Sequence, residues 1–102
     1  MFIYDRLTGK PIFGVEERPV PLSEAPGEHS SPTQPFPVKP PQLARNSIKK
    51  EDLWDLTPEH AAYCRQLWEK NNAYNDGPYT PYDTRDKGRT AVIFPGAIGG
   101  GN

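Results

Sequence analysis

The sequence predicts a chain of three parts: a β-hairpin, a long proline-rich excursion with short α-helices, and one further strand. Three observations predict this order. Two apolar runs flank a turn within residues 3–13, prolines crowd residues 15–46, and a helix-start signal lies at Thr57. These patterns are typical of a hairpin, an extended segment and a helix. The expected boundaries of the three parts are 1–14, 15–88 and 89–102.

The composition limits the size of the core. Of 102 residues, 34% are hydrophobic, 13 are proline and 9 are glycine, and the mean hydropathy is −0.79. Such a chain buries little apolar surface. The net charge of −1 provides no basic field for nucleic acid or for an anionic membrane surface. Cys64 is the single cysteine, which excludes an internal disulfide and a cysteine-based metal site.

Both ends of the chain lie close to strand-like runs. It begins within an apolar run and closes on Gly99-Gly100-Gly101-Asn102, directly after another such run. A polar tail or a completed element is more usual at a natural terminus. We therefore expect an internal segment of a longer protein.

Residues 3–13 predict the hairpin. Ile3-Tyr4 and Ile12-Phe13 are β-favouring pairs, and the turn between them reads Asp-Arg-Leu-Thr-Gly-Lys. Gly9 can adopt the positive φ that a tight turn requires. Any Asp/Thr/Gly hairpin would fit these residues.

The proline-rich stretch covers residues 15–46. Prolines fix φ and remove backbone donors, so they favour an extended, polyproline-like geometry. Apolar residues between them, such as Val20 and Phe36, would let the stretch pack along a surface. A disordered spacer or an SH3-type ligand is the alternative on composition. The prolines are Pro19, Pro21, Pro26, Pro32, Pro35, Pro37, Pro40 and Pro41.

The clearest helical signal starts at Thr57. Thr57 is a typical N-cap, and Pro58 suits the first helical position because its missing N–H is not needed there. The helix is expected to end at Asn71-Asn72, since asparagine tolerates the left-handed conformation. A shorter helix is expected over residues 49–54. The predicted apolar face, with Cys64 as a small buried residue, consists of Ala61, Cys64, Leu67 and Trp68.

The remainder of the chain predicts a loop over residues 75–81 and a strand over residues 89–94. The charged residues 83–87 are expected to form a solvated turn. Glu16 and Glu17 are neighbours in an extended segment, so their side chains should point in opposite directions into solvent. The two histidines, His29 and His60, have no second ligand beside them, which argues against a metal site.

Six strings follow one another along the chain: Asp-Arg-Leu-Thr-Gly-Lys-Pro, Val-Glu-Glu-Arg-Pro-Val-Pro, Ser-Pro-Thr-Gln-Pro-Phe-Pro, Leu-Thr-Pro-Glu, Gly-Pro-Tyr-Thr-Pro and Phe-Pro-Gly-Ala-Ile-Gly-Gly-Gly-Asn. In this order the chain resembles an internal part of the pyrroloquinoline quinone (PQQ)-dependent dehydrogenases, on the membrane-bound glucose dehydrogenase side of that family. The resemblance implies that the parent protein is mainly β, with the fold of an eight-bladed β-propeller. In the family's blade motif, Asp5 and Thr8 would tie the hairpin turn together. Phe13 would take the place of the tryptophan that docks between blades.

The resemblance also implies the chemistry. The family holds PQQ and a divalent metal, usually calcium, and oxidises a sugar or alcohol hydroxyl by hydride transfer to the quinone. The electrons then pass to a membrane quinone acceptor at the periplasmic face of the inner membrane. The family's catalytic carboxylate and its cationic PQQ contact would both lie before Met1. We therefore expect no catalytic residue and no metal ligand in this chain. The segment alone, without the remaining blades, should be inactive.

Asn102 is the candidate cofactor-binding residue. It matches a polar position after the family's glycine loop that lies at the cofactor, although some relatives carry a different polar residue there. The alternative is that Asn102 only ends a glycine-rich turn. For the chain as a whole, the alternative function is a non-catalytic propeller or a proline-rich interaction module.

Overall fold

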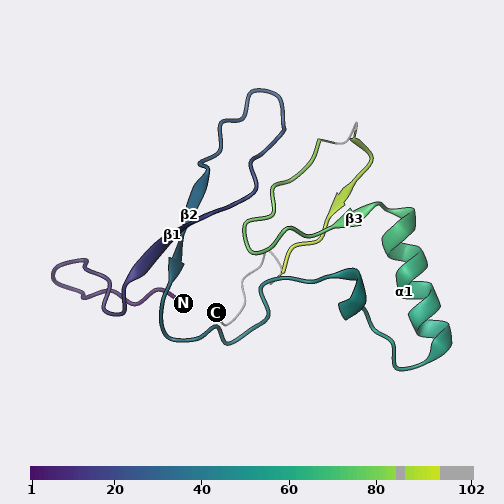
Figure 1. Ribbon diagram of the computed structural model, residues 1–102, viewed down its shortest axis with the longest axis horizontal. Coiled ribbons are helices and arrows are strands. Elements are labelled where there is room, and N and C mark those ends of the chain that lie inside the picture. The colour runs from purple at the N-terminus through teal and green to yellow at the C-terminus, as the bar shows by residue number, and fades with distance from the viewer. Residues whose placement is uncertain (85–86, 95–102) are drawn as a thin grey trace.

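The computed structural model describes residues 1–84 and 87–94, and Figure 1 shows long loops joining a few short regular elements. The Cα radius of gyration is 16.8 Å, whereas a compact domain of this length has about 13 Å. The chain is therefore extended. Its elements are β1 (Val15–Pro19), β2 (Thr33–Pro37), the 3₁₀ turn η1 (Lys50–Asp52), α1 (Pro58–Lys70), β3 (Ala73–Tyr74) and β4 (Thr90–Ala91).

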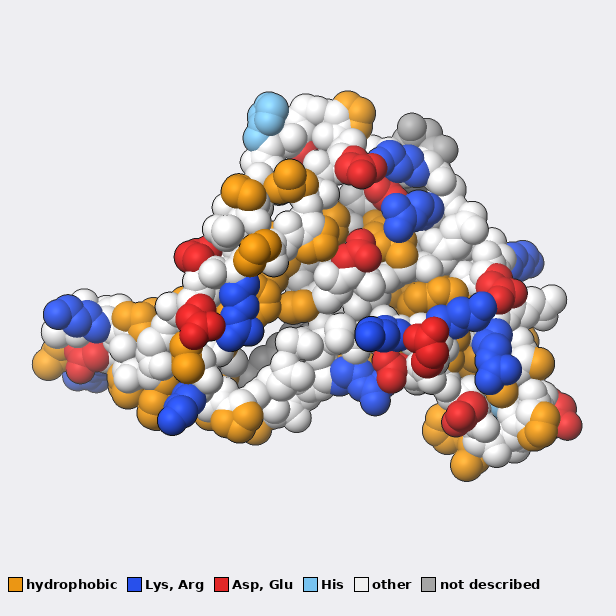
Figure 2. Space-filling model, in the orientation of Figure 1, with side chains coloured by type: hydrophobic (Ala, Val, Ile, Leu, Met, Phe, Trp, Pro, Cys, Tyr) orange, Lys and Arg blue, Asp and Glu red, His pale blue; other side chains and the backbone are white. Residues whose placement is uncertain are grey.

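The core is small. Among the described residues, Ala61 and Tyr74 are the buried hydrophobic residues and Thr80 is the buried polar one. Figure 2 shows hydrophobic side chains on the surface at both ends of the molecule, over the N-terminal hairpin and over α1. Within residues 1–84 and 87–94, no helix is long and apolar enough to cross a membrane. The large exposed side chains include Tyr4, Leu7, Ile12, Phe13, Trp54, Leu56 and Tyr63.

The predicted N-terminal hairpin is present, although its strands are reduced to a single bridge between Tyr4 and Pro11. Gly9 has a φ of 71°, as its place in the turn requires. Asp5 holds the turn, because its Oδ1 accepts from the N–H of Leu7 at 3.0 Å, the N–H of Thr8 at 2.7 Å and the hydroxyl of Thr8 at 2.8 Å. The expectation that Asp5 and Thr8 tie this turn together is thus confirmed.

The proline-rich stretch folds differently from the expectation. It is not one extended run, because β1 and β2 pair antiparallel, from Val15 opposite Pro37 to Pro19 opposite Thr33. Hydrogen bonds at 3.3 Å from Val38 N to Gly14 O and at 3.1 Å from Val20 N to Pro32 O continue the ladder. Bonded and non-bonded pairs alternate in such a ladder.

This alternation explains how the prolines are accommodated. The pairs just beyond the two ends of the ribbon, 14–38 and 20–32, are hydrogen-bonded, so the alternation makes 15–37, 17–35 and 19–33 the non-bonded pairs. Pro19, Pro35 and Pro37 all lie in these non-bonded pairs. Their missing N–H groups therefore cost no hydrogen bond between the strands. Proline content alone could not indicate this, because pairing depends on which prolines face the partner strand.

The helix predicted from Thr57 to Asn71 is confirmed as α1. Thr57 caps it by accepting a hydrogen bond at 3.3 Å from His60 N, and Pro58 occupies the first turn. Asn72, with a φ of 44°, takes the left-handed conformation after the helix. The predicted apolar face is only partly correct: Ala61 is buried and Cys64 and Trp68 are half-buried, but Leu67 is 49% exposed. The described chain provides too little surface to cover the whole stripe.

The shorter helix expected over residues 49–54 is one 3₁₀ turn, η1. The Asp52 carboxylate accepts from Lys49 N at 2.9 Å, which satisfies a free N–H at the start of the turn. Leu53 is already extended, with a ψ of 153°. A 3₁₀ turn of this length is common as a connector.

The last strand is also shorter than expected. Only Thr90–Ala91 of residues 89–94 forms a strand, β4, although Val92 N donates to Tyr74 O at 2.8 Å. Its parallel partner, β3, follows α1 almost immediately and was not predicted. Two residues are too few to show a sequence period, so β3 depends on its partner rather than on a local pattern.

Candidate functional site

Several hydrogen bonds hold the segment that follows α1. Thr90 N donates to Asn72 O at 3.4 Å, and the side-chain amide of Asn72 donates to Gly88 O at 3.2 Å. The Tyr74 hydroxyl donates to Pro81 O at 2.7 Å. These bonds place residues 72–75 alongside residues 88–92, which fixes the start of the chain's last described stretch.

Asn75 joins three separate parts of this region. Its side chain accepts from Ile48 N at 3.1 Å and donates to Val92 O at 2.8 Å. It also takes part in the loop that follows, where Thr80 is buried. The Asn-Asp-Gly pattern predicts only a loop at Asn75, because a turn signal does not reveal contacts with residues far along the chain.

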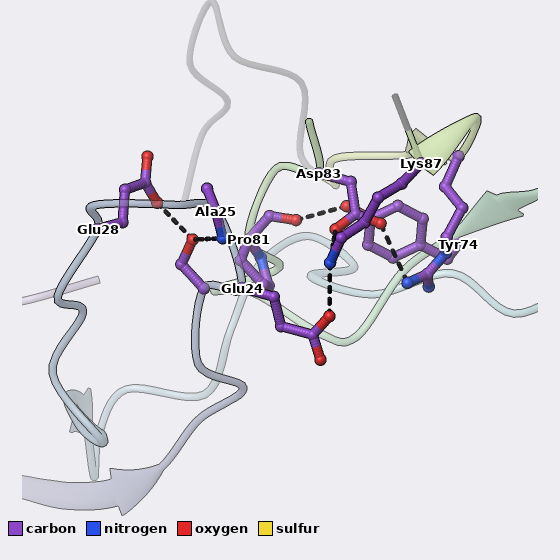
Figure 3. Close-up of polar contacts among 9 residues, drawn as sticks. Glu24, Ala25, Glu28, Tyr74, Pro81, Asp83 and Lys87 are labelled. Atoms are coloured by element: carbon purple, nitrogen blue, oxygen red, sulfur yellow. Dashed lines mark hydrogen bonds and ion pairs between the residues drawn. The ribbon is translucent and has the colours of Figure 1, made fainter. Parts of the chain in front are cut away.

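A charged cluster lies against the same segment (Figure 3). Lys87 Nζ lies 2.6 Å from Glu24 Oε2 and 3.6 Å from Asp83 Oδ1. The Arg89 guanidinium lies 3.1 Å from Asp83 Oδ2 and stands over the Tyr74 ring at 4.0 Å from its centroid. A guanidinium on an aromatic face is a favourable cation–π arrangement. The cluster therefore attaches the loop after β1 to the segment before β4.

The prediction of a solvated turn over residues 83–87 is wrong at Asp83, whose side chain is only 10% exposed. Its Oδ2 atom is inaccessible to solvent and makes no well-aligned hydrogen bond among the described residues. The nearby Arg89 guanidinium balances its charge, which a buried carboxylate requires. Arg85 and Asp86 lie outside the described residues.

Ion pairing and burial determine whether each pKa in the cluster is raised or lowered. The hydrogen bond from Lys87 lowers the pKa of Glu24, and the same bond raises the pKa of Lys87. Burial raises the pKa of the Tyr74 hydroxyl, with the nearby Asp83 charge adding to the effect. All three groups therefore keep their ordinary charge states at neutral pH. The pairs hold the loops together and provide no group poised for proton transfer.

A groove of about 830 Å³ lies beside β2. The Phe36 and Tyr79 rings meet edge to face at 5.3 Å, the Arg18 guanidinium stands 5.1 Å from the Phe36 ring centroid, and the Tyr79 hydroxyl donates to Pro35 O at 2.8 Å. Arg18 is itself paired with Glu16 at 2.8 Å. Because most of the other lining residues are prolines and apolar side chains, the groove suits packing rather than chemistry.

The structure does not bring the other polar candidates together. His29 and His60 are both exposed, and so are Glu16 and Glu17, as expected for a solvated pair. Within residues 1–84 and 87–94, no group of three or more His, Cys, Asp or Glu side chains is arranged to hold a metal ion. Asn102, the candidate cofactor contact, lies outside the described residues.

Comparison with known proteins identifies the family. The family model described as "Glucose/ethanol/alcohol dehydrogenase, beta-propeller domain", the PQQ domain, matches residues 1–102. The chain therefore belongs to the PQQ-dependent (quinoprotein) dehydrogenase family, and its segment is of the β-propeller type. This confirms the resemblance inferred from the six strings.

Individual relatives agree with the family assignment. The chain is 39% identical over 101 residues to quinate/shikimate dehydrogenase (quinone) of Acinetobacter baylyi, covering 99% of this chain and 12% of that protein. It is 40% identical over 100 residues to the glycerol dehydrogenase large subunit of Gluconobacter thailandicus, covering 97% and 13%. It is 35% identical over 102 residues to quinoprotein glucose dehydrogenase of Gluconobacter oxydans, covering 97% and 11%. The chain thus spans about one eighth of the length of these relatives, and no solved structure matches it.

The charged cluster around Asp83 does not fit PQQ, the cofactor of the family. PQQ is a planar quinone with carboxylate groups, so it requires cations that are free to face it. Lys87 and Arg89 already face Glu24 and Asp83. The carboxylates near them are likewise balanced by these cations, which disfavours a divalent metal there. The cluster therefore joins segments of the chain and offers neither PQQ nor a divalent metal a site.

Proposed function

We propose that this chain is one segment of a PQQ-dependent dehydrogenase that oxidises a sugar or alcohol hydroxyl by hydride transfer to the quinone. The observation that carries the proposal is the match of the family model to all of residues 1–102. The relatives are named for quinate or shikimate, glycerol and glucose, which are all polyhydroxylated molecules. A substrate with several hydroxyl groups is therefore the class we favour.

The proposed architecture is an eight-bladed propeller. Residues 1–14 would end one blade, residues 15–88 would form an excursion between blades, and residues 89–102 would begin the next blade. The exposed apolar side chains of the hairpin support this arrangement, because Leu7 is 88%, Ile12 57% and Phe13 45% exposed. Such side chains are usually covered in a complete protein.

The proposal includes the cofactor environment and the cellular location. PQQ would be the electron acceptor, with a divalent metal, calcium, beside it, and a membrane quinone would take the electrons onward at the periplasmic face of the inner membrane. The name of the Acinetobacter baylyi relative includes a quinone, which supports this acceptor class. Asn102 would contact PQQ through its side-chain amide, which can both donate and accept a hydrogen bond.

The first experiment tests the reaction in the full-length protein that contains this chain. The purified apo-protein is titrated with PQQ in the presence of Ca²⁺, and oxidation of glucose, glycerol and quinate is followed with an artificial electron acceptor. We expect oxidation of at least one of these substrates that depends on PQQ and is lost on removal of Ca²⁺ with a chelator. A folded protein that neither binds PQQ nor oxidises any of them would support a non-catalytic propeller instead.

The second experiment tests Asn102. Replacement Asn102→Ala should weaken PQQ binding or slow turnover, with little change in the melting temperature of the apo-protein. The loss of one buried polar contact costs about 1–3 kcal/mol, mostly because its partner is left without a hydrogen bond. Unchanged PQQ affinity together with unchanged turnover would assign Asn102 to the glycine-rich turn alone.

A further inference from the structure

A cleft of about 320 Å³ lies between the loop that joins β1 to β2, residues 20–32, and residues 79–82. Its volume is at the lower end of the range for small-molecule sites and is large enough for a single sugar ring. Apolar side chains form much of the walls, and a few polar groups are set among them. The groups used below belong to Glu28, Gln34 and Tyr82.

Hydrogen bonds hold both walls of the cleft in place. On one side, the Ser30 hydroxyl accepts from Ser23 N at 2.9 Å, and the Ser23 hydroxyl donates to Glu28 (Figure 3). On the other side, the Tyr79 hydroxyl donates to Pro35 O at 2.8 Å, which joins residues 79–82 to β2. The loops are therefore ordered before a ligand arrives, which lowers the entropic cost of binding.

The polar groups of the cleft can bind hydroxyl groups. A carboxylate has about four lone-pair positions, and Glu28 uses one of them for the Ser23 hydroxyl. Gln34 is half-buried in β2, and its amide bonds to no other residue within 1–84 and 87–94. This amide can donate two hydrogen bonds and accept others. The Tyr82 ring, 65% exposed, offers a flat apolar face to the C–H surface of a sugar ring.

The charge of the cleft disfavours an anionic ligand. Among the described residues that line it, the one charged group is the Glu28 carboxylate. Arg18 lies opposite Gln34 in the ribbon, but it lines the neighbouring groove, where it pairs with Glu16 and stands over Phe36. A negative ligand in the cleft would meet a like charge with no cation beside it. A neutral ligand avoids this repulsion.

We propose that this cleft binds a neutral polyol about the size of one sugar ring, through Glu28, Gln34 and the ring of Tyr82. The choice of ligand class rests on the proposed function, whose substrates carry several hydroxyl groups. Within that class the cleft distinguishes glucose from quinate. Both molecules are six-membered rings with several hydroxyl groups, but quinate also carries a carboxylate, which Glu28 repels.

The test measures glucose and quinate binding to the full-length apo-protein by isothermal titration calorimetry, without PQQ and at low ionic strength. Glucose should bind about tenfold more tightly than quinate. Gln34→Ala and Tyr82→Ala should each weaken glucose binding about tenfold, because each removes a contact with the ligand. The matched controls are Gln66→Ala and Tyr63→Ala, whose side chains are exposed on α1 outside the cleft. Their glucose affinity should be unchanged.

The variant Glu28→Gln separates the effect of charge from that of shape. Removal of the charge should raise quinate affinity about tenfold and change glucose affinity less. Quinate binding as tight as glucose binding in the unaltered protein, or glucose affinity unchanged in both Gln34→Ala and Tyr82→Ala, would overturn the inference. Because these measurements need no PQQ, such a failure leaves the proposed oxidation intact. Glucose binding that follows these expectations, without any PQQ-dependent oxidation, would count against the proposed function alone.

Discussion

Asp5 organises its turn with one carboxylate oxygen. The backbone N–H of Thr8, its hydroxyl and the N–H of Leu7 all donate to it, and together they hold the pKa of Asp5 below its ordinary value of 3.8. The ionised form is therefore the one that stabilises the turn. The N–H and the hydroxyl of Thr8 make the two largest contributions to the lowered pKa of Asp5, so the turn depends on both residues together.

This arrangement predicts a pH dependence of the hairpin. Since the folded pKa of Asp5 is depressed, its contribution is fully present above pH 3.8 and is lost as the pH falls through the lower, folded pKa. The amide shifts of Leu7 and Thr8 in NMR spectra of the full-length protein should report this loss. The Asp5→Asn variant should show no such titration; a similar titration in that variant would assign the effect to another group.

Asp83 and Asn75 show why the candidate site was only partly predictable. A run of charged residues is usually solvated, and the sequence does not show that Arg89 and Tyr74 would enclose the Asp83 carboxylate. The bonds of Asn75 reach Ile48 and Val92, which lie 27 and 17 residues away. Both residues owe their environment to contacts between distant segments. Asn102 came from the family resemblance and not from any local pattern.

Among the elements, α1 was predictable because its signals are local. The N-cap, the proline in the first turn and the terminal asparagines lie within the helix or next to it, and they agree with one another. The β1–β2 ribbon was missed because its strands are separated by a loop of 13 residues, 20–32, and each strand contains at least one proline. The parallel pair β3–β4 was missed because its strands are two residues long.

The cap of α1 provides a stability prediction. Replacing Thr57 with alanine removes the acceptor for His60 N and should lower the unfolding free energy of the full-length protein by about 1 kcal/mol. Denaturant unfolding followed by circular dichroism would measure this change. Thr57→Asp, which keeps an acceptor and adds a charge that favours the helix N-terminus, should retain the stability. An equal loss in both variants would contradict the capping role.

For the whole molecule, the small core predicts weak independent stability. Only Ala61 and Tyr74 are buried hydrophobic residues in the described chain, and a hairpin or two-stranded ribbon alone is marginal in water. We expect the isolated 102 residues to show weak amide protection and no cooperative melting transition. A sharp two-state thermal transition of the isolated chain would show that the described contacts are sufficient for folding.

The proline positions in the β1–β2 ribbon have a consequence for association with other molecules. At the non-bonded positions of a ladder, the N–H groups point away from the partner strand, toward the open edge. In β2 these positions are Thr33, Pro35 and Pro37, so two of the three donors that a further strand would need are missing from its open edge. Exposed edges are common starting points for aggregation, and proline is one means of blocking them. The prolines of β2 therefore disfavour the addition of a third strand at this edge. They do so without removing a hydrogen bond between β1 and β2.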